Sequence, residues 1–287
     1  MTRILLLVGT NIAVMIVFGI ITTIFGLDRY VGGSNLSLVI YAACFGFIGS
    51  FVSLFLSKSM AIRSMRVQLI EQPTNATERW LLETVHRQAD EAGVGRPDVG
   101  VFQSPTPNAF ATGWNKNDAL VAVSTGLLQT MGREEVEAVL GHEVAHVYNG
   151  DMVTMGLIQG VLNTFVIIFS RLLGGLLDNM LSGGRSRGYG PGFFIGNLVG
   201  NVLFGALAGI VAAWFSRQRE FRADAGGARL AGREHMIGAL QALKRGGPSD
   251  LPSSLQAFGI SGGGRLATLM ATHPPLDVRI ERLRSAA

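Results

Sequence analysis

Four long apolar segments constrain the fold of this 287-residue chain more than any other feature. None of them contains a charged residue, and they cover residues 4–26, 36–57, 152–170 and 193–215. A helix of about 20 apolar residues crosses the hydrocarbon core of a bilayer. The pattern therefore predicts a mainly α-helical membrane protein with four transmembrane helices. Gln159 and Asn163 interrupt the third and shortest segment, so the alternative for the last two segments is a pair of buried helices in a soluble domain.

The first apolar segment has a second interpretation as a signal peptide, because Arg3 precedes it. It is long for the apolar part of such a peptide, and no small-residue cleavage site follows it. We therefore interpret it as an uncleaved anchor. It forms a transmembrane hairpin with the second segment, within residues 1–57.

The composition favours insertion into a membrane and excludes several other classes of protein. Hydrophobic residues make up 48% of the chain and charged residues 15%, whereas soluble domains carry about 25% charged residues. The single cysteine, Cys44, excludes an internal disulfide and a cysteine-rich metal site. The net charge is +4, and the basic residues gather beside the apolar segments, which suits a lipid bilayer. No basic stripe with interleaved aromatic residues indicates a nucleic-acid partner.

The order of the apolar segments predicts a soluble part made of two pieces on one side of the membrane. Residues 58–151 and 217–287 form these pieces, and a second transmembrane hairpin covers residues 152–216. The positive-inside rule places the side with more flanking basic residues in the cytoplasm. That side carries Arg3, Lys58, Arg63, Arg66, Arg217, Arg219 and Arg222, and the opposite side carries Arg29, Arg171, Arg185 and Arg187.

The soluble pieces combine helical and strand patterns, which predicts an α+β domain with a small sheet. Amphipathic or helical periodicity covers residues 77–92, 133–149, 235–244 and 274–284. Short apolar or alternating runs predict strands at residues 98–103 and 119–123, with an extended segment at 107–113 between them.

The run His142-Glu143-Val144-Ala145-His146 lies in the second of these helical patterns and predicts a metal site. Two histidines four residues apart stack on one helix face, where both can bind one metal ion. Glu143 is placed to take a proton from a metal-bound water, whose pKa zinc lowers to about 7. The motif predicts a zincin-like hydrolytic site with one Zn²⁺ per chain. A helix with two incidental histidines is the alternative.

A catalytic zinc ion usually takes three protein ligands and keeps one position open, so the motif needs a third ligand. Glu220 and Asp224 follow the fourth apolar segment and share a helix face, because they stand four residues apart. One carboxylate could bind zinc while the other orients a ligand histidine through its free ring nitrogen. A charged helix face with exposed salt bridges explains the same pattern equally well.

Two further parts of the sequence are candidates for substrate contact. His273 precedes two prolines and a helical run with Arg279, and either side chain could stabilise the oxyanion of a tetrahedral intermediate. A solvated histidine at the start of a helix is the alternative. The extended segment with Asn108 and Phe110 could pair with a substrate backbone as an edge strand. The pattern alone favours the alternative, a core strand before a glycine turn.

Five motifs in one order together resemble the HtpX family of bacterial membrane heat-shock zinc proteases, which is related to the CAAX prenyl proteases. The motifs are PNAFA (residues 107–111), GHEVAH (141–146), NGD (149–151), SRQREFRAD (216–224) and HPP (273–275), and the four apolar segments match as well.

The resemblance implies specific roles for the residues of these motifs. It implies His142, His146 and Glu220 as zinc ligands, Glu143 as the general base, and Asp224 as the partner of a ligand. It also implies a multi-pass protein of the bacterial cytoplasmic membrane. Its substrates would be misfolded or damaged membrane proteins, cut on the cytoplasmic side as part of the stress response.

Three other functions are possible on the sequence. A membrane chaperone or scaffold with structural zinc would need four protein ligands, and only three good candidates occur. A transporter would place ionisable residues inside its spans, whereas the polar residues there are uncharged and few. A processing protease for lipidated peptides would use the same zinc residues, but four spans are few for a large enclosed chamber. We therefore expect a zinc-dependent endopeptidase.

Overall fold

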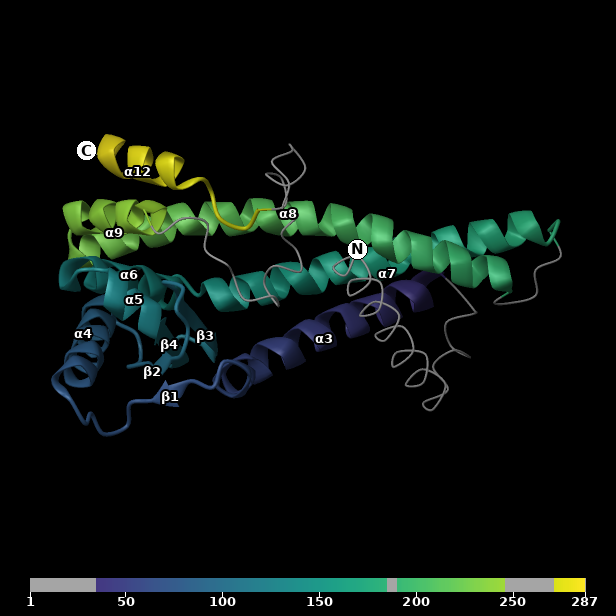
Figure 1. Cartoon of the computed structure of the whole chain (residues 1–287). Coiled ribbons are helices and arrows are strands. Elements are labelled where there is room, and N and C mark those ends of the chain that lie inside the picture. The colour runs from purple at the N-terminus through teal and green to yellow at the C-terminus, as the bar shows by residue number, and fades with distance from the viewer. Residues whose placement is uncertain (1–34, 185–189, 246–270, 287) are drawn as a thin grey trace. The chain divides into compact units, whose positions relative to one another are not determined.

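A computed structural model describes residues 35–184, 190–245 and 271–286, and Figure 1 labels their helices and strands. These residues are mainly helical, with one four-stranded sheet. The predicted span at residues 4–26 lies outside the described residues. The chain divides into two compact units. We call them the apolar unit (Met1–Phe51, Leu157–Ala213 and Leu255–Met270) and the sheet unit (Val52–Gly156, Trp214–Ser254 and Ala271–Ala287).

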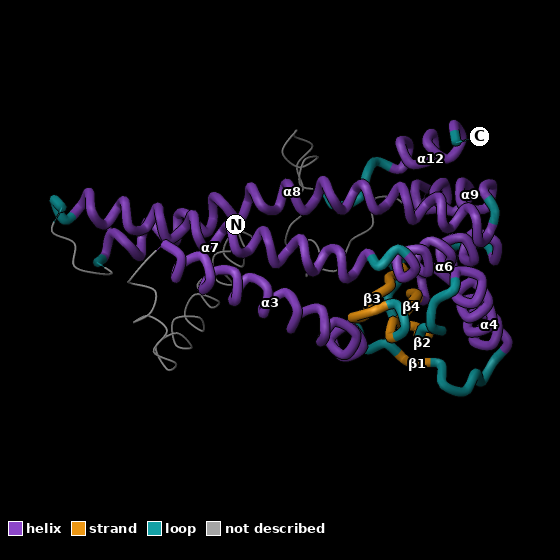
Figure 2. Tube along the Cα trace, turned by 180° about the vertical axis from the view of Figure 1, so that it is seen from behind, coloured by secondary structure: helices purple, strands orange, loops and turns teal. Residues whose placement is uncertain are grey.

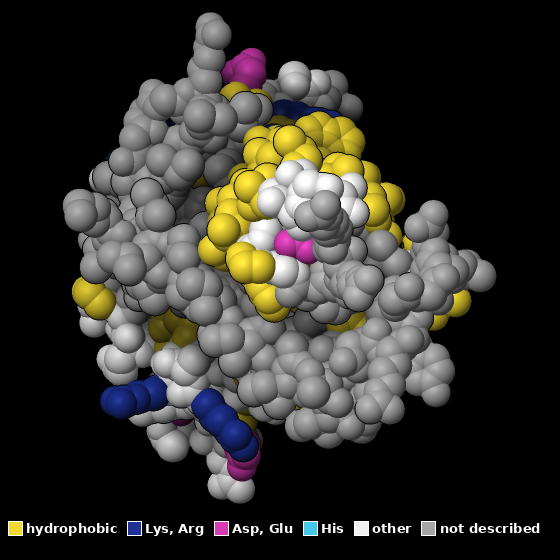
Figure 3. Space-filling view, turned by 90° about the vertical axis from the view of Figure 1, so that its right-hand side faces the viewer, with side chains coloured by type: hydrophobic (Ala, Val, Ile, Leu, Met, Phe, Trp, Pro, Cys, Tyr) yellow, Lys and Arg dark blue, Asp and Glu magenta, His cyan; other side chains and the backbone are white. Residues whose placement is uncertain are grey.

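Three long helices match the second, third and fourth apolar segments of the sequence. They are α3 (Asn35–Ser64), α7 (Asp151–Leu181) and α8 (Pro191–Ala231), and each is long and apolar enough to cross a membrane. Only 6% of the most apolar part of α7 and 11% of that of α8 are buried, so neither is the core helix of a soluble domain. In the part of Figure 3 that is not grey, hydrophobic side chains gather at the surface.

The helices α7 and α8 are longer than the apolar segments that predicted them. Helix α7 begins at Asp151 and continues to Leu181, while α8 runs past Phe215 to Ala231. No glycine or proline interrupts residues 216–225, so the charged run after the apolar segment stays helical. The helix ends before Gly232, whose φ of 99° suits glycine. Glu220 and Asp224 are therefore carried by the same helix as the fourth apolar segment.

The sheet contains β1 (Gln68–Leu69), β2 (Asp98–Phe102), β3 (Ala109–Asn115) and β4 (Asp118–Ser124), in the order β1-β2-β4-β3. Strands β2 and β4 are parallel, whereas β1 and β3 run antiparallel to their neighbours. The strands predicted at residues 98–103 and 119–123 are present. The extended segment at 107–113 becomes β3, which is an edge strand of this sheet.

Each face of the sheet packs against helices of the sheet unit. Val99, Val121 and Val123 face the larger core, which α4 (Ala76–Ala92) and α6 (Arg133–Tyr148) complete. Figure 2 shows these two helices beside the strands. A smaller core on the other face joins Phe102 and Leu120 to the last turns of α3. The remaining helices are α5 (Thr125–Thr130), α9 (Arg233–Arg245) and α12 (Leu276–Ser285).

Candidate metal centre

Helix α6 carries the two histidines and Glu143 and is buried along most of its second half. It begins where the Glu135 carboxylate accepts a hydrogen bond from the Gly132 N–H at 2.8 Å, which satisfies one of the free donors at a helix start. His142 and Glu143 are 7% and 9% exposed. The predicted helix at residues 133–149 is thus present to within one residue.

Helix α8 supplies the carboxylates because it packs directly on α6. A Cβ atom at Gly226 would collide with the Cβ of Ala145, so only glycine permits this approach of the two helices. Glu220 and Asp224, 2% and 1% exposed, lie on α8 just before this contact and reach the histidines of α6. Two helices that are distant in the sequence therefore build one site.

The three predicted ligands converge with the spacing that zinc requires. The Nε2 atoms of His142 and His146 are 3.2 Å apart. Glu220 places Oε1 at 3.4 Å from the Nε2 of His146 and Oε2 at 3.6 Å from the Nε2 of His142. Bonds of about 2.0–2.1 Å in a tetrahedron separate ligand atoms by about 3.3 Å. Two imidazoles and one carboxylate are also a donor set that zinc prefers, so these residues fit Zn²⁺.

Each ligand histidine has its own supporting carboxylate. Asp224 Oδ1 lies 3.0 Å from the Nδ1 of His142, and Asp151 Oδ2 lies 2.7 Å from the Nδ1 of His146. A carboxylate at Nδ1 holds the ring in place and leaves Nε2 for the metal. The predicted role of Asp224 as the partner of a ligand is compatible with this contact and stays a prediction.

The supporting role of Asp151 was not predicted from the sequence, although the residue lies in one of the family motifs. Gly150 has a φ of 65°, which turns the chain sharply from α6 into α7. This turn brings Asp151, the first residue of α7, back onto His146. Asp151 is 1% exposed, and Nη2 of Arg222 lies 3.5 Å from its other carboxylate oxygen. The Asn-Gly-Asp run that begins three residues after the second histidine was the signal available.

The carboxylates make the site strongly attractive to cations. Burial opposes protonation of His146, but hydrogen bonds to Asp151 and Glu220 outweigh it and raise the pKa of His146 to about 10. Burial likewise opposes protonation of His142, but Asp224 and Glu220 raise its pKa. A divalent metal ion would take the place of these protons, because metal ligands bind in the deprotonated form.

Arg279 and His273 both lie beside Glu220 but differ in their environment. Arg279 is 6% exposed and donates two hydrogen bonds to Asp224, at 2.8 Å from Nε and 2.6 Å from Nη2. Its Nη1 lies 3.4 Å from Oε2 of Glu220. The Nδ1 of His273 lies 2.8 Å from the same oxygen, and its side chain is 57% exposed. His273 is therefore open to a substrate, whereas the Arg279 guanidinium is bonded to carboxylates.

Asn108 and Phe110 lie at the start of β3. The Asn108 N–H donates to the Ser124 hydroxyl at 2.9 Å, and its carbonyl accepts from the Ser124 N–H at 2.8 Å. The ring of Phe110 packs 5.5 Å from that of Phe102 in the smaller core. Among the described residues no strand pairs with the outer edge of β3. This segment therefore offers a free backbone edge, while the Phe110 side chain packs inward.

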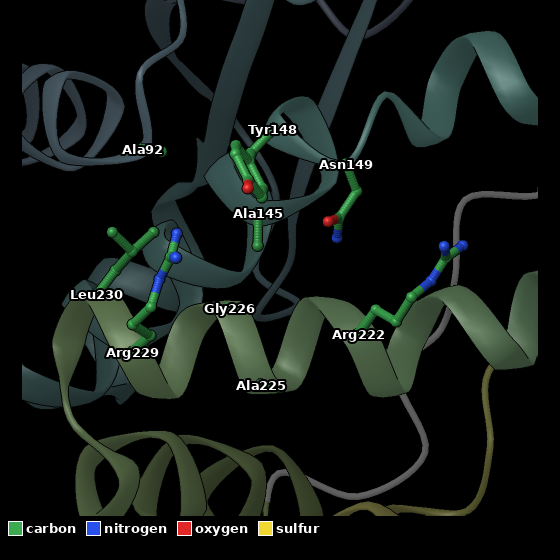
Figure 4. Close-up of a pocket in the computed structure, with 9 residues that line it drawn as sticks. All are labelled: Ala92, Ala145, Tyr148, Asn149, Arg222, Ala225, Gly226, Arg229 and Leu230. Carbon is green, nitrogen blue, oxygen red and sulfur yellow. The ribbon is translucent and has the colours of Figure 1, made fainter.

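A separate pocket of about 250 Å³ opens between α6 and α8 (Figure 4). Arg222 and Arg229 of α8, Tyr148 of α6 and Asn149 directly after it line the pocket, with Ala145 and Gly226 between them. None of the three candidate zinc ligands lines this pocket. The metal centre is therefore a distinct site.

Comparison with known proteins gives one consistent family. The sequence model of the family described as "Peptidase family M48" matches residues 75–287 of this chain. Protease HtpX of Thioalkalivibrio sulfidiphilus (strain HL-EbGR7) is 56% identical over 293 residues, which covers 99% of both chains. Protease HtpX of Xanthomonas axonopodis pv. citri (strain 306) is 56% identical over 99% of this chain and 98% of its own.

A crystal structure of S. mikatae Ste24p has a similar fold. It superposes with a TM-score of 0.64 at 17% identity, over 97% of this chain and 65% of that one. The similarity of fold, the sequence relatives and the His142, His146 and Glu220 site all agree. The chain belongs to peptidase family M48 and is a membrane zinc metalloprotease of the HtpX type.

Proposed function

We propose that this protease cleaves misfolded or damaged membrane proteins, and other unfolded proteins, at the cytoplasmic face of the bacterial cytoplasmic membrane. The observation that carries the proposal is that residues of the metal site lie next to the apolar parts of the long helices. Asp151 is the first residue of α7, and Glu220 follows the apolar part of α8 by about one and a half helical turns. Metal-site residues so close to the apolar segments suit substrates that enter or leave a bilayer.

The proposed topology follows the four apolar segments and their flanking charges. Residues 1–57 and 152–216 form the two transmembrane hairpins, and residues 58–151 and 217–287 form the two parts of a zincin-like protease domain. Arginines and Lys58 flank the membrane on the side of that domain, which supports the cytoplasm as its location.

In the proposed mechanism His142, His146 and Glu220 hold the metal. Zinc bound there would supply an acidified water and polarise the peptide carbonyl. Glu143 would accept the proton of that water and return it to the leaving amine. His273, exposed beside Glu220, donates a hydrogen bond to the oxyanion. Arg279 keeps Asp224 and Glu220 in position through the contacts described above.

The same proposal assigns the outer edge of β3, beginning at Asn108 and Phe110, to the substrate backbone. The Ser124 N–H bonds to Asn108, so the alternation of an antiparallel pair turns the backbone groups of Ala109 and Ala111 outward. Main-chain hydrogen bonds to an edge strand depend little on the side chains of the ligand. Such an edge suits unfolded segments of varied sequence.

Replacing Ala111 by proline tests the edge strand. Proline removes the outward N–H but leaves the pairing with β4, because edge strands accept proline where the N–H faces away from the sheet. We expect KM for an unfolded protein to rise about tenfold, the loss of one hydrogen bond, with zinc content unchanged. Ala111→Ser keeps the N–H and is the matched control. Equal KM values for the two variants would exclude β3 as the substrate edge.

The substrate class is tested with the full chain in liposomes and a single-span test substrate. The cytoplasmic segment of this substrate is either a stably folded domain or a destabilised variant of that domain. We expect cleavage of the destabilised variant only, because an edge strand pairs with extended backbone. The reaction stops with a chelator and returns with added Zn²⁺. Equal cleavage of the two substrates would contradict selection for unfolded protein, and cleavage of neither would contradict the proposed substrate class.

A further inference from the structure

The hairpin of β3 and β4 is fastened to the end of the apolar segment of α3. Lys58 of α3 forms ion pairs with Asp98 Oδ2, at 3.0 Å, and with Asp118. These two aspartates begin β2 and β4. The indole Nε1 of Trp114 donates a hydrogen bond of 2.8 Å to the other oxygen of Asp118. One lysine and one indole therefore hold the same end of the sheet on α3.

Trp114 extends the apolar surface of α3 onto this hairpin. Its ring packs edge-on against the ring of Phe55, with the centroids 5.9 Å apart. Both rings stay open to the surroundings, because Trp114 is 44% and Phe55 64% exposed. Leu56 and Met60 of α3 are also 42% and 58% exposed. The exposed apolar surface thus continues from the membrane-spanning helix to the hairpin.

Polar and charged groups lie beside the apolar patch at this end of the sheet. Lys58 is the first charged residue after the apolar segment of α3, and its side chain is only 21% exposed. Lys116 is exposed in the turn after Trp114. Tryptophan collects at the boundary between acyl chains and head groups, where its ring is apolar and its N–H is bonded to a polar group. The contacts of Trp114 match this pattern.

We propose that the β3–β4 hairpin is an interfacial membrane contact, in which Trp114 and Phe55 insert at the head-group level of the leaflet beside α3. The partner of this surface is the lipid bilayer. The exposed apolar patch is continuous with α3, which is long and apolar enough to cross a bilayer. The exposed amine of Lys116 then meets the anionic phosphates. The contact holds the end of the sheet at the lipid surface.

This contact has a consequence for the substrate edge. Trp114 is the second-last residue of β3, so one end of the proposed substrate edge lies at the membrane surface. A segment that leaves the bilayer would meet β3 at this end first. This consequence rests on the proposed function, whereas the lipid contact of Trp114 does not.

Tryptophan fluorescence tests the lipid contact with the full chain in liposomes of phosphatidylcholine and phosphatidylglycerol. The chain has three tryptophans, and variants with two of them changed to phenylalanine retain Trp114, Trp214 or Trp80 alone. Brominated lipids quench indoles that they touch. With bromine near the head-group end of the acyl chains, we expect roughly twofold quenching of Trp114 and less with bromine near the methyl end.

The other two tryptophans serve as controls. Trp214, which is 51% exposed in the apolar part of α8, should be quenched by the brominated lipids. Trp80 lies on the charged helix α4, under the guanidinium of Arg133, and neither brominated lipid should quench it. Circular dichroism first shows that the helices of each variant are intact, which confirms its fold. Quenching of Trp214 without quenching of Trp114 would overturn the proposal, whether or not the edge strand binds substrate.

Discussion

A Glu143→Gln chain is expected to bind one zinc ion and to cleave unfolded protein about a thousandfold more slowly than the natural chain. Glu143 lies next to His142 on α6, but the histidines and Glu220 already provide three ligands. Glutamine has nearly the same shape and cannot accept the proton of a zinc-bound water. The change therefore removes the base and leaves the metal. Metal analysis of the purified protein and kcat on an unfolded substrate give the two readouts.

The matched control for this variant is Glu134→Gln, the same chemical change on the same helix. The Glu134 side chain is 77% exposed, and its ion-pair partner is His235 on α9 rather than a group in the metal centre. It should bind zinc and cleave substrate as the natural chain does. Full activity of Glu143→Gln would rule out Glu143 as the base, and loss of its zinc would assign this residue to metal binding instead.

When the carboxylates of the site are changed one at a time, the loss of zinc affinity should be large for the ligand and smaller for the two supporting carboxylates. Glu220→Ala removes a ligand, and we expect a loss of roughly a thousandfold or more together with loss of cleavage. Asp151→Asn and Asp224→Asn only weaken the support of His146 and His142, so losses of about 10–100-fold are expected. Competition with a chelating dye measures all three affinities in detergent.

Asp277→Asn is the control for this series. The Asp277 side chain is 72% exposed and pairs with Lys244 rather than with a ligand. Its zinc affinity should equal that of the natural chain. Asp224→Asn also leaves the buried Arg279 without its full partner, so circular dichroism must show that the helices of this variant are intact. Equal affinities for Glu220→Ala and Asp151→Asn would contradict the assignment of Glu220 as a ligand.

Local sequence patterns predicted the parts of the site but not how they meet. The helical period of residues 133–149 was sufficient to place His142, Glu143 and His146 on one helix, because that relation is set within a few turns. Residue type alone could not decide whether Glu220 is a ligand or a surface charge. The answer depends on the close contact of Gly226 with Ala145, and these residues are far apart in the sequence.

Other side chains show the same limit of local reasoning. Asp151 reaches His146 only because Gly150 adopts a left-handed conformation. Arg279 was one of two candidates for the oxyanion contact. It lies beside Glu220, but its bidentate pairing with Asp224 could not be inferred from the helical period of its sequence. The inward orientation of Phe110 follows from the register of β3 with β4, a relation between two strands.

The division of the metal ligands along the chain has a consequence for how the protein is made. His142 and His146 leave the ribosome before α7, whereas Glu220 follows the apolar segment of α8. A chain whose synthesis stops between these helices holds only two of the three ligands. Hydrolysis therefore starts only after the last apolar segment has been translated. An incomplete chain therefore lacks the metal centre with which it could cut the proteins around it.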